Sequence, residues 1–369
     1  MASYTFPTGK DPAFMLGCGR LRMEEHLLEN CAGEILRLGR NPLFVCDRTS
    51  RALAFGKVAG ALGAEGVRLR EVTHSGFCCR EDALALAGTG ALDGVDVVLG
   101  CGGGVILDFS KCLADIAGAP LVTIPTSSAT CCAYTPIAVC YTREGRYVST
   151  SHFRREVAAA LLDTAILCGQ PRRLLAAGAL DAMAKKIEIE FWDTIPAAGD
   201  GGTAAPAIAS AVSDYIYSDI DAKIDTALED LGRGVPTRAL LDVIYCSIAG
   251  AGFVSGISGG SRQVALAHRL YYGARTLAPE LASRFTHGEI VAVGLVLQLA
   301  YYGRDDEAAR LAARLRSWGL AATMGELGLP HGPAEAESYV EYIMGTKTMK
   351  AVGPSGEAPL RRAMAAVFK

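Results

Sequence analysis

The chain has 369 residues and a formal net charge of −3, from 36 Lys and Arg against 39 Asp and Glu. This length predicts about two domains with ordinary cores. We expect neither a membrane nor nucleic acid as a partner, because no apolar run reaches the ~18 residues of a membrane span and the basic residues are scattered.

Strand-like and helix-like segments alternate through the first half of the chain. In chain order, we predict a strand over 13–16, a helix over 22–38, a strand over 42–46, a helix over 52–62, a strand over 67–72, a helix over 81–88, a strand over 95–99, a helix that begins at Val105 and a strand over 121–124. This alternation predicts an α/β domain with a mostly parallel sheet and helices on both faces. Ligands bind such sheets beyond the carboxyl ends of the strands, where Asp47, Gly102 and Thr126 fall.

A glycine-rich turn separates the strand over 95–99 from the helix that begins at Val105. Gly102, Gly103 and Gly104 allow several backbone N–H groups to point at one spot at the helix start, where a pyrophosphate group can bind. The alternative is a turn that binds nothing, because a single glycine motif is weak support for a nucleotide site.

Asp47 follows the buried strand over 42–46. A carboxylate at a strand end beside a nucleotide site commonly accepts hydrogen bonds from ribose hydroxyls and repels a 2′-phosphate, which favours NAD over NADP. The alternative is an N-cap for the helical segment that begins near Arg51. In the common dinucleotide fingerprint the acid follows the glycine loop, whereas Asp47 precedes it, so that template does not fit.

The second half of the chain is almost entirely helical in pattern. We predict helices over 172–192, 206–231, 236–253, 260–274, 289–302 and 305–318, and a flexible loop over 196–206. The expected architecture is an N-terminal α/β nucleotide-binding domain over residues 1–170, followed by an all-helical domain over residues 171–369.

Asp181, His268 and His287 lie in this helical half. One carboxylate and two imidazoles can hold Zn²⁺ or Fe²⁺ and leave coordination positions open for a substrate. The spacing alone does not decide, because Asp181 could cap a helix and His268 could be a hydrogen-bonded core histidine.

Twelve cysteines are present, with no CxxC pair and with two adjacent doublets, Cys78-Cys79 and Cys131-Cys132. This pattern fits neither a disulfide framework nor a zinc knuckle. Most of the other cysteines lie in apolar stretches, where a free thiol packs as a small hydrophobic side chain. Together with a first segment that shows no secretory signal, the pattern predicts a reduced, cytoplasmic protein.

Six motifs in order along the chain carry a resemblance to a known family. They are GGGVILDFSK (102–111), IPTSSATCCAYTPIAVCYT (124–142), GALDAMAKKIE (178–188), GFVSGISGG (252–260), LAHRLYYG (266–273) and THGEIVAVGLVLQL (286–299). Over nearly its whole length the chain resembles the glycerol dehydrogenase branch of the iron-containing (group III) alcohol dehydrogenase superfamily, whose distant relatives include dehydroquinate synthase. The resemblance implies a homo-oligomer whose helical domain binds metal and substrate.

The resemblance also implies that NAD binds along the glycine turn and the segment after the strand over 121–124. Val105, Ala129 and Thr135 differ from the residues common in the family, so side-chain hydrogen bonds at 105 and 129 are lost while backbone contacts remain. Asp108 is expected to cap or orient the turn. The implied NAD contacts are Asp47, Gly102, Gly103, Gly104, Val105, Asp108, Thr126, Ala129, Thr135, Ile137 and Tyr141.

A divalent metal on Asp181, His268 and His287 is implied as well. The iron enzymes of the superfamily carry a further histidine one helical turn after the aspartate, where this chain has Lys185. A protonated lysine cannot ligate a metal ion, so we expect a three-ligand zinc site rather than a four-ligand iron site. Lys185 could instead pair with Asp181 in an empty site or donate a proton to the substrate oxygen.

Glycerol dehydrogenases place an aspartate at the position of Cys131, where it hydrogen-bonds a polyol hydroxyl. A thiol is a weak hydrogen-bond partner, so we expect a less hydroxylated alcohol or carbonyl compound as the substrate. Cys131 could also be a reactive thiol, a metal ligand or simply a residue that lines the pocket.

The expected activity is the NAD-linked interconversion of a small alcohol or polyol with its carbonyl compound, with Asp181, His268, His287 and Lys185 as the catalytic group. Two alternatives remain. One is a lyase or synthase that uses NAD transiently, as dehydroquinate synthase does, and the other is a non-catalytic cofactor-binding homologue whose metal site is occupied by Lys185.

Overall fold

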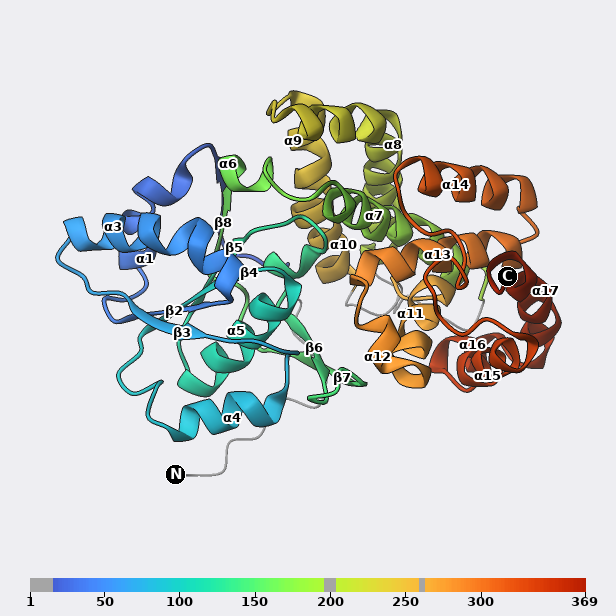
Figure 1. Cartoon of the computed structure of the whole chain (residues 1–369), viewed down its shortest axis with the longest axis horizontal. Coiled ribbons are helices and arrows are strands. Elements are labelled where there is room, and N and C mark those ends of the chain that lie inside the picture. The colour runs from blue at the N-terminus through green and yellow to red at the C-terminus, as the bar shows by residue number, and fades with distance from the viewer. Residues whose placement is uncertain (1–15, 196–203, 259–262) are drawn as a thin grey trace.

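The computed structural model describes residues 16–195, 204–258 and 263–369. One half of the molecule contains the strands and the other is built from long helices (Figure 1). The strands are β1 (Leu21–Glu24), β2 (Pro42–Cys46), β3 (Arg70–Thr73), β4 (Val97–Gly102), β5 (Leu121–Pro125), β6 (Ile137–Tyr141), β7 (Tyr147–His152) and β8 (Ala159–Asp163). The helices among and after them are α1 (Ala32–Leu36), α2 (Arg48–Ser50), α3 (Gly56–Ala64), α4 (Arg80–Gly88), α5 (Gly104–Ala117) and α6 (Thr164–Leu167), with the short helical turns η1 (Leu27–Asn30), η2 (Arg51–Phe55) and η3 (Cys131–Ala133).

Six of the strands form a parallel sheet in the order β1-β8-β5-β4-β2-β3, and β6 and β7 form a separate antiparallel hairpin. The expected mostly parallel α/β sheet is therefore confirmed. Cys46 lies beside Cys101, and Gly102 lies beside Pro125. The residues that follow β2, β4 and β5 consequently meet at one edge of the sheet, as parallel strands require.

Helices cover both faces of this sheet because successive side chains of a strand point to opposite sides. Leu43 and Val45 of β2 face α5 and α4, in a cluster that includes Phe109. Phe44 and Cys46 face the opposite side, where α1 and α3 pack. The sequence of β2 is continuously apolar because both faces of this strand are buried.

The predicted helix over 22–38 is wrong. Leu21–Glu24 instead pairs in parallel with β8 as an edge strand. His26 then takes the left-handed conformation with φ of 56°, which ends any regular continuation, and only η1 and the five-residue α1 follow. Of the strand expected over 13–16, residues 13–15 lie outside the described residues, and Leu16 is not in a strand.

The segment 137–163, for which the pattern predicted no element, supplies β6, β7 and β8. β8 is fully buried between β1 and β5, so its sequence AALLD shows no alternation that would mark a strand. From Thr164 onwards the described residues form helices and their connections, and the first long helix begins at Arg172.

The helical half is formed by α7 (Arg172–Asp193), α8 (Ala205–Arg233), α9 (Arg238–Tyr245), η4 (Cys246–Gly250), α10 (Ala251–Ile257), α11 (Leu266–Leu277), α12 (Pro279–Ala282), α13 (His287–Tyr301), α14 (Asp305–Ser317), α15 (Pro333–Met344), α16 (Lys347–Val352), η5 (Pro354–Gly356) and α17 (Glu357–Val367). The helices predicted over 172–192, 206–231, 236–253, 289–302 and 305–318 are confirmed in substance. The helix predicted over 260–274 begins only at Leu266 among the described residues. Residues 196–203 of the predicted loop lie outside the described part of the chain, and Pro206 is already inside α8.

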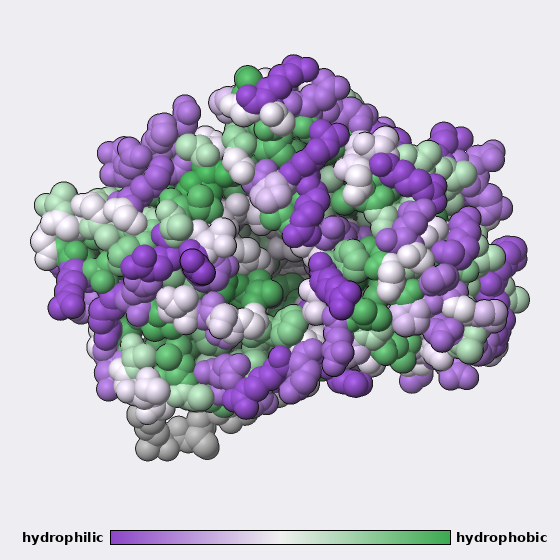
Figure 2. All heavy atoms as spheres, in the orientation of Figure 1, coloured by the Kyte–Doolittle hydropathy of each residue, from purple (hydrophilic) through white to green (hydrophobic). Residues whose placement is uncertain are grey.

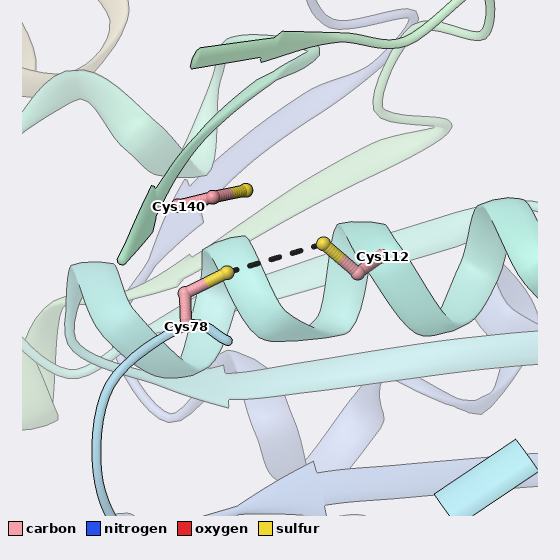
Figure 3. Close-up of side chains that lie close together, drawn as sticks. All are labelled: Cys78, Cys112 and Cys140. Atoms are coloured by element: carbon pink, nitrogen blue, oxygen red, sulfur yellow. Dashed lines mark hydrogen bonds between the residues drawn. The ribbon is translucent and has the colours of Figure 1, made fainter. Parts of the chain in front are cut away.

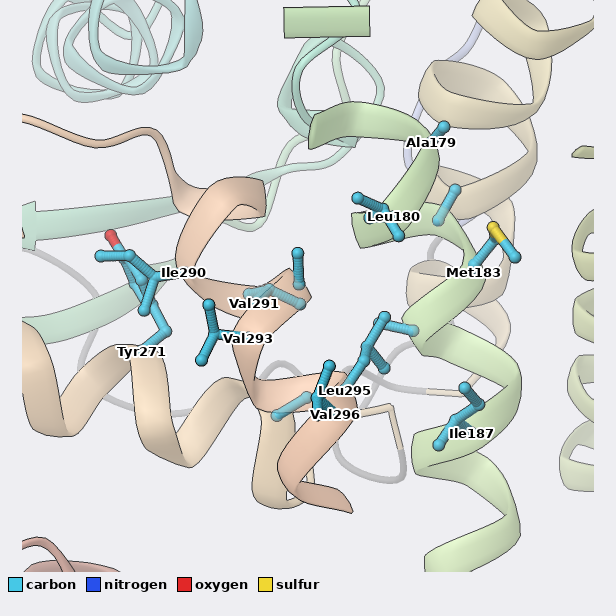
Figure 4. Packing of buried hydrophobic residues seen from close by; sticks show 14 of the residues in the cluster. Ala179, Leu180, Met183, Ile187, Tyr271, Ile290, Val291, Val293, Leu295 and Val296 are labelled. Atoms are coloured by element: carbon cyan, nitrogen blue, oxygen red, sulfur yellow. The ribbon is translucent and has the colours of Figure 1, made fainter. Parts of the chain in front are cut away.

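Three helices form the centre of this half. Figure 4 shows α13 between its two neighbours, with Leu180 and Ile187 of α7 on one side of it and Tyr271 of α11 on the other. These side chains belong to one continuous hydrophobic cluster of the helical half. It fixes the relative positions of the helices that carry Asp181, His268 and His287.

One helical run, Arg238–Ile257, is 20 residues long and apolar enough by composition to cross a membrane. However, 67 % of its most apolar window is buried inside the protein, where α9 and α10 pack against α8. Core packing accounts for its apolar character.

Candidate active site

Asp181, His268 and His287 are brought together from α7, α11 and the first residue of α13. Nε2 of His268 lies 3.4 Å from Oδ1 of Asp181, and Nε2 of His287 lies 3.3 Å from the same oxygen. The two imidazole ring centres are 4.9 Å apart. One nitrogen or oxygen from each residue lies within 4.8 Å of the other two, a spacing that suits three ligands of one metal ion.

Two glycines permit this convergence. A Cβ atom on Gly288 would collide with the backbone of Ala177 in α7, and a Cβ atom on Gly294 would collide with the backbone of Ala267 in α11. The bare backbone of α13 therefore packs directly against both neighbouring helices. His287 precedes the first of these contacts, and His268 follows Ala267, so both imidazoles are held close to α7.

The group fits a bound cation. Asp181 and His268 are only 2 % and 3 % exposed, and Oδ1 of Asp181 accepts no hydrogen bond. A buried carboxylate oxygen without a partner is costly, and a metal ion between this oxygen and the two Nε2 atoms would remove that cost. Carboxylate and imidazole donors suit Zn²⁺ or Fe²⁺.

The protonation states of Asp181 and His287 agree with this donor set. Burial alone would raise the pKa of Asp181, but the positive charge of Lys185 and the contacts with His287 and His268 outweigh it and hold that pKa well below its usual value. Burial is the main influence on His287 and lowers its pKa, so its imidazole is neutral at neutral pH. A carboxylate and a neutral imidazole are the forms that bind a metal ion.

Glu188 is a site residue that the sequence analysis missed. Its Oε2 lies 2.5 Å from Nδ1 of His268, and its Oε1 accepts hydrogen bonds from the N–H groups of His268 and Ala265. Burial opposes a charge on His268, but Glu188 and Asp181 outweigh it and raise the histidine pKa. The one available signal was spacing, since Glu188 follows Asp181 by seven residues, two turns of the same helix.

Lys185 and Cys131 lie beside Asp181. Lys185 is 3 % exposed, and although burial opposes its charge, Asp181, Cys131 and Glu188 raise its pKa, so it stays protonated. Its charge acts on Asp181, but the two form no direct ion pair. Cys131 is 9 % exposed, its Sγ lies 3.9 Å from Oγ of Ser255, and burial raises its pKa, so it is a neutral thiol.

The glycine turn forms at the carboxyl edge of the sheet, where a nucleotide was expected. Gly102 has φ of 155°, and a Cβ atom there would press against Ile106, so only glycine fits. Its carbonyl accepts the N–H of Thr126, which ties the ends of β4 and β5 together. Gly103 and Gly104 then begin α5 with no side-chain cap, so the first N–H groups of this helix are left for a ligand.

Asp47 caps α2. Its Oδ1 accepts the N–H of Ser50 at 2.7 Å, and the hydroxyl of Ser50 accepts the N–H of Asp47. The N-cap alternative is therefore part of the structure, one turn earlier than expected. A contact with a ribose is compatible with the cap, because a carboxylate has several acceptor positions.

Asp108 does not cap the glycine turn. Its two oxygens accept hydrogen bonds from Lys111 Nζ and from the N–H of Val139, and Lys111 also donates to the carbonyl of Ile137. Asp108 and Lys111 are both buried, so this pair fastens α5 to β6.

Figure 2 shows a hollow in the surface between the two halves of the molecule. Ala129 and Thr135 are buried in the segment after β5, and Val105 is partly exposed at the start of α5. The hydroxyl of Tyr141 lies 2.6 Å from that of Tyr271, whose ring packs against His287 with centres 4.2 Å apart. These contacts connect the sheet half to the metal-binding group.

The segment after β5 also meets α7 directly. A Cβ atom on Gly178 would collide with the backbone of Ser128, which lies two residues beyond Thr126. Gly178 precedes Asp181 by less than one helical turn. The carboxyl edge of the sheet and the group of Asp181, His268 and His287 are therefore neighbours.

Comparisons with known proteins identify the family of the chain. Residues 18–164 match the family model described as iron-containing alcohol dehydrogenase. The chain is 31 % identical over 307 residues to hydroxycarboxylate dehydrogenase A of Escherichia coli K12, covering 82 % of each chain, and 28 % identical to a glycerol dehydrogenase of Pseudomonas putida, covering 78 % of this chain and 77 % of that one.

Among solved structures, glycerol dehydrogenase from Schizosaccharomyces pombe superposes with a TM-score of 0.84 at 20 % identity, covering 99 % of this chain and 92 % of that one. Both the fold and the sequence therefore lead to one group of enzymes. The chain belongs to the iron-containing alcohol dehydrogenase superfamily, as a glycerol dehydrogenase-like member, and is an alcohol dehydrogenase.

Proposed function

We propose that this alcohol dehydrogenase is a metal-dependent, NAD-linked oxidoreductase that interconverts a small alcohol and its carbonyl compound. The observation that carries the proposal is the buried Oδ1 atom of Asp181, which lacks a hydrogen bond and faces Nε2 of both His268 and His287. This group lies next to the uncapped start of α5, the expected place for the nucleotide.

Each residue of the group has a distinct task. Asp181, His268 and His287 would hold the metal ion, which when bound supplies Lewis-acid polarisation of the substrate oxygen, while NAD supplies the hydride acceptor. Glu188 holds Nδ1 of His268, so that Nε2 faces Asp181. Lys185 keeps a positive charge beside the reacting oxygen.

The proposed metal is zinc rather than iron. Lys185 stands where the family's iron enzymes have a fourth ligand, and its pKa is raised, so it presents an ammonium group rather than a lone pair. Three protein ligands with an open fourth position are typical of catalytic zinc.

Cys131 supports an altered substrate preference. It is a buried neutral thiol beside Lys185 and Asp181, where the related glycerol dehydrogenases are expected to have an aspartate. A thiol binds a second or third substrate hydroxyl poorly, so we propose a substrate less hydroxylated than glycerol.

A hydroxycarboxylate is the second candidate substrate. The neutral Cys131 leaves the buried ammonium of Lys185 free to attract an anionic group, and a related protein is named hydroxycarboxylate dehydrogenase A. A substrate carboxylate would offset the cost of burying that charge.

A panel of small alcohols, diols, glycerol and 2-hydroxycarboxylates, assayed by NADH absorbance with added Zn²⁺ or Fe²⁺, tests the proposal. Stoichiometric NADH formation with a simple alcohol or a hydroxycarboxylate supports it. Turnover without net NADH would instead indicate a lyase or synthase that uses NAD transiently. A metal content below ~0.2 equivalents after repletion would indicate a non-catalytic homologue, because a site with zinc-like affinity fills under these conditions.

Two further expectations belong to this proposal. All twelve cysteines are free thiols, which supports a reducing, cytoplasmic location. A homo-oligomer is expected from the family, and light scattering coupled to size-exclusion chromatography measures it.

A further inference from the structure

A second cluster of metal-binding side chains lies away from the active site. Cys78 precedes α4, Cys112 lies on α5 and Cys140 lies on β6, so the fold brings together three cysteines that are far apart in the sequence. All three are at most 1 % exposed. Figure 3 shows their sulfur atoms gathered in one place, and all three lie within 4.8 Å of one another.

The spacing of the sulfurs suits a shared metal ion. Sγ of Cys78 lies 3.9 Å from Sγ of Cys112. The sulfurs of a disulfide are about 2.0 Å apart. Two thiolates that each bind one metal ion at about 2.3 Å lie about 3.8–4.0 Å apart, for bond angles between tetrahedral and trigonal. Two of the three sulfurs therefore lie at the spacing of thiolates that share one metal ion, and the sulfur of Cys140 lies within 4.8 Å of both.

One of the three sulfurs has polar neighbours. Sγ of Cys140 lies 3.5 Å from Oγ of Ser151, which in turn accepts a hydrogen bond from Arg80. These groups place a positive charge near the cluster, where it would favour bound thiolates. A thiolate is the form that binds metals, so the thiols would release their protons on binding.

We propose that Cys78, Cys112 and Cys140 form a three-thiolate site for a soft, thiophilic metal ion, with Cu(I) as its occupant. Soft thiolates select Cu(I) among the common ions, and three of them satisfy it. Structural zinc requires a fourth strong ligand. Asp108, a buried carboxylate one turn before Cys112 on α5, already accepts hydrogen bonds from Lys111 and Val139 with its two oxygens.

A pocket borders the cluster on the side of Cys140. Cys140 lines a pocket of about 260 Å³ together with Cys79, Arg80 and Tyr141. All three cysteines belong to the hydrophobic cluster that includes Phe109 of α5. A metal ion there would join α5 to β6 and to the segment before α4, about two turns beyond the helix start at the glycine turn.

The test is an anaerobic titration of the reduced full-length protein with Cu(I), in competition with the chromophoric Cu(I) chelator bicinchoninate. Zn²⁺ is present to fill the Asp181 site. We expect the protein to retain one Cu(I) per chain in competition with the chelator. The bound ion should give thiolate-to-copper charge-transfer absorption in the ultraviolet. Cys112→Ala should weaken this binding by more than the ~10–100-fold typical of substitutions outside the ligand shell.

Two control variants sharpen the result. Cys31→Ala removes an equally buried free thiol on the opposite face of the sheet, and it should bind Cu(I) as the wild type does. His268→Ala should also retain Cu(I), since this proposal does not depend on the active site. Equal Cu(I) retention by Cys112→Ala and the wild type, or no retention by the wild type, would overturn the proposal.

X-ray absorption spectroscopy of the copper-loaded wild type provides a readout that needs no variant. A spectrum that is fitted by three sulfur ligands at a single Cu–S bond length supports the site. A spectrum that requires nitrogen or oxygen ligands overturns it.

Discussion

Nδ1 of His268 lies 2.5 Å from Oε2 of Glu188, and both side chains are buried. The other oxygen of Glu188 accepts the backbone N–H groups of Ala265 and His268, at the start of α11. One carboxylate therefore fixes both the imidazole ring and the backbone that carries it. This contact leaves Nε2 of His268 directed at Asp181.

Glu188→Gln tests this relationship. The amide can still accept backbone hydrogen bonds but no longer places a negative charge against the imidazole, so His268 becomes a weaker ligand. We expect metal affinity to fall by ~10–100-fold while the fold persists. Chelator competition measures the affinity. Glu190→Gln, on the same helix but partly exposed and paired with Arg304, is the matched control, and equal affinities of the two variants would contradict the assigned role.

Asp47→Asn separates the two roles of Asp47. Asparagine caps helices about as well as aspartate, so α2 should remain intact, while the charge that repels a 2′-phosphate is lost. We expect kcat/KM with NADP to rise relative to that with NAD. An unchanged cofactor preference in this folded variant would show that Asp47 serves only as the cap of α2.

Cys131→Asp tests the origin of the substrate preference. A carboxylate at this position can accept hydrogen bonds from a polyol, and it opposes the attraction of Lys185 for an anionic substrate. We expect kcat/KM for glycerol to rise relative to 1-propanol and that for 2-hydroxycarboxylates to fall. Cys131→Ser, which changes polarity without adding charge, is the control. If the ratios stay the same in Cys131→Asp, the thiol is only a lining residue.

Lys185→Met removes the buried positive charge beside Asp181 and keeps the length of the side chain. Because that charge repels a divalent cation, we expect zinc to bind about tenfold more tightly, which corresponds to about 1.4 kcal/mol. Activity with anionic substrates should fall at the same time. Lys186→Met alters the neighbouring lysine, which is partly exposed and paired with Asp214, and it should change neither property. Identical zinc affinities for the wild type and Lys185→Met would contradict this electrostatic role.

The sequence predicted those parts of the fold whose pattern is local. β2 and β5 were found because both of their faces are buried and their apolar runs end at turns, and α5 was found because Ile106, Phe109 and Leu113 recur on one face. β1 was missed because pairing with β8 and the left-handed His26 override the helical pattern of 22–38. Such long-range pairing is not visible in a single segment.

The candidate site, like the fold, was predicted only in part. Asp181, His268 and His287 were predicted as a group, mainly through the family motifs, and the structure brings them together. Glu188 was missed because a carboxylate within an apolar helix has no partner until α11 is placed beside it. The three-cysteine cluster was missed because the chain order separates Cys78, Cys112 and Cys140 among nine other cysteines.

The most direct test of the central claim combines metal content with NADH formation in the wild type and in His268→Ala, after chelation and repletion with Zn²⁺. The wild type should regain about one equivalent of zinc together with alcohol-dependent NADH formation, whereas His268→Ala, folded by circular dichroism, should regain neither. Full metal content and activity in His268→Ala, or undiminished activity of the wild type after its metal is removed, would contradict the account.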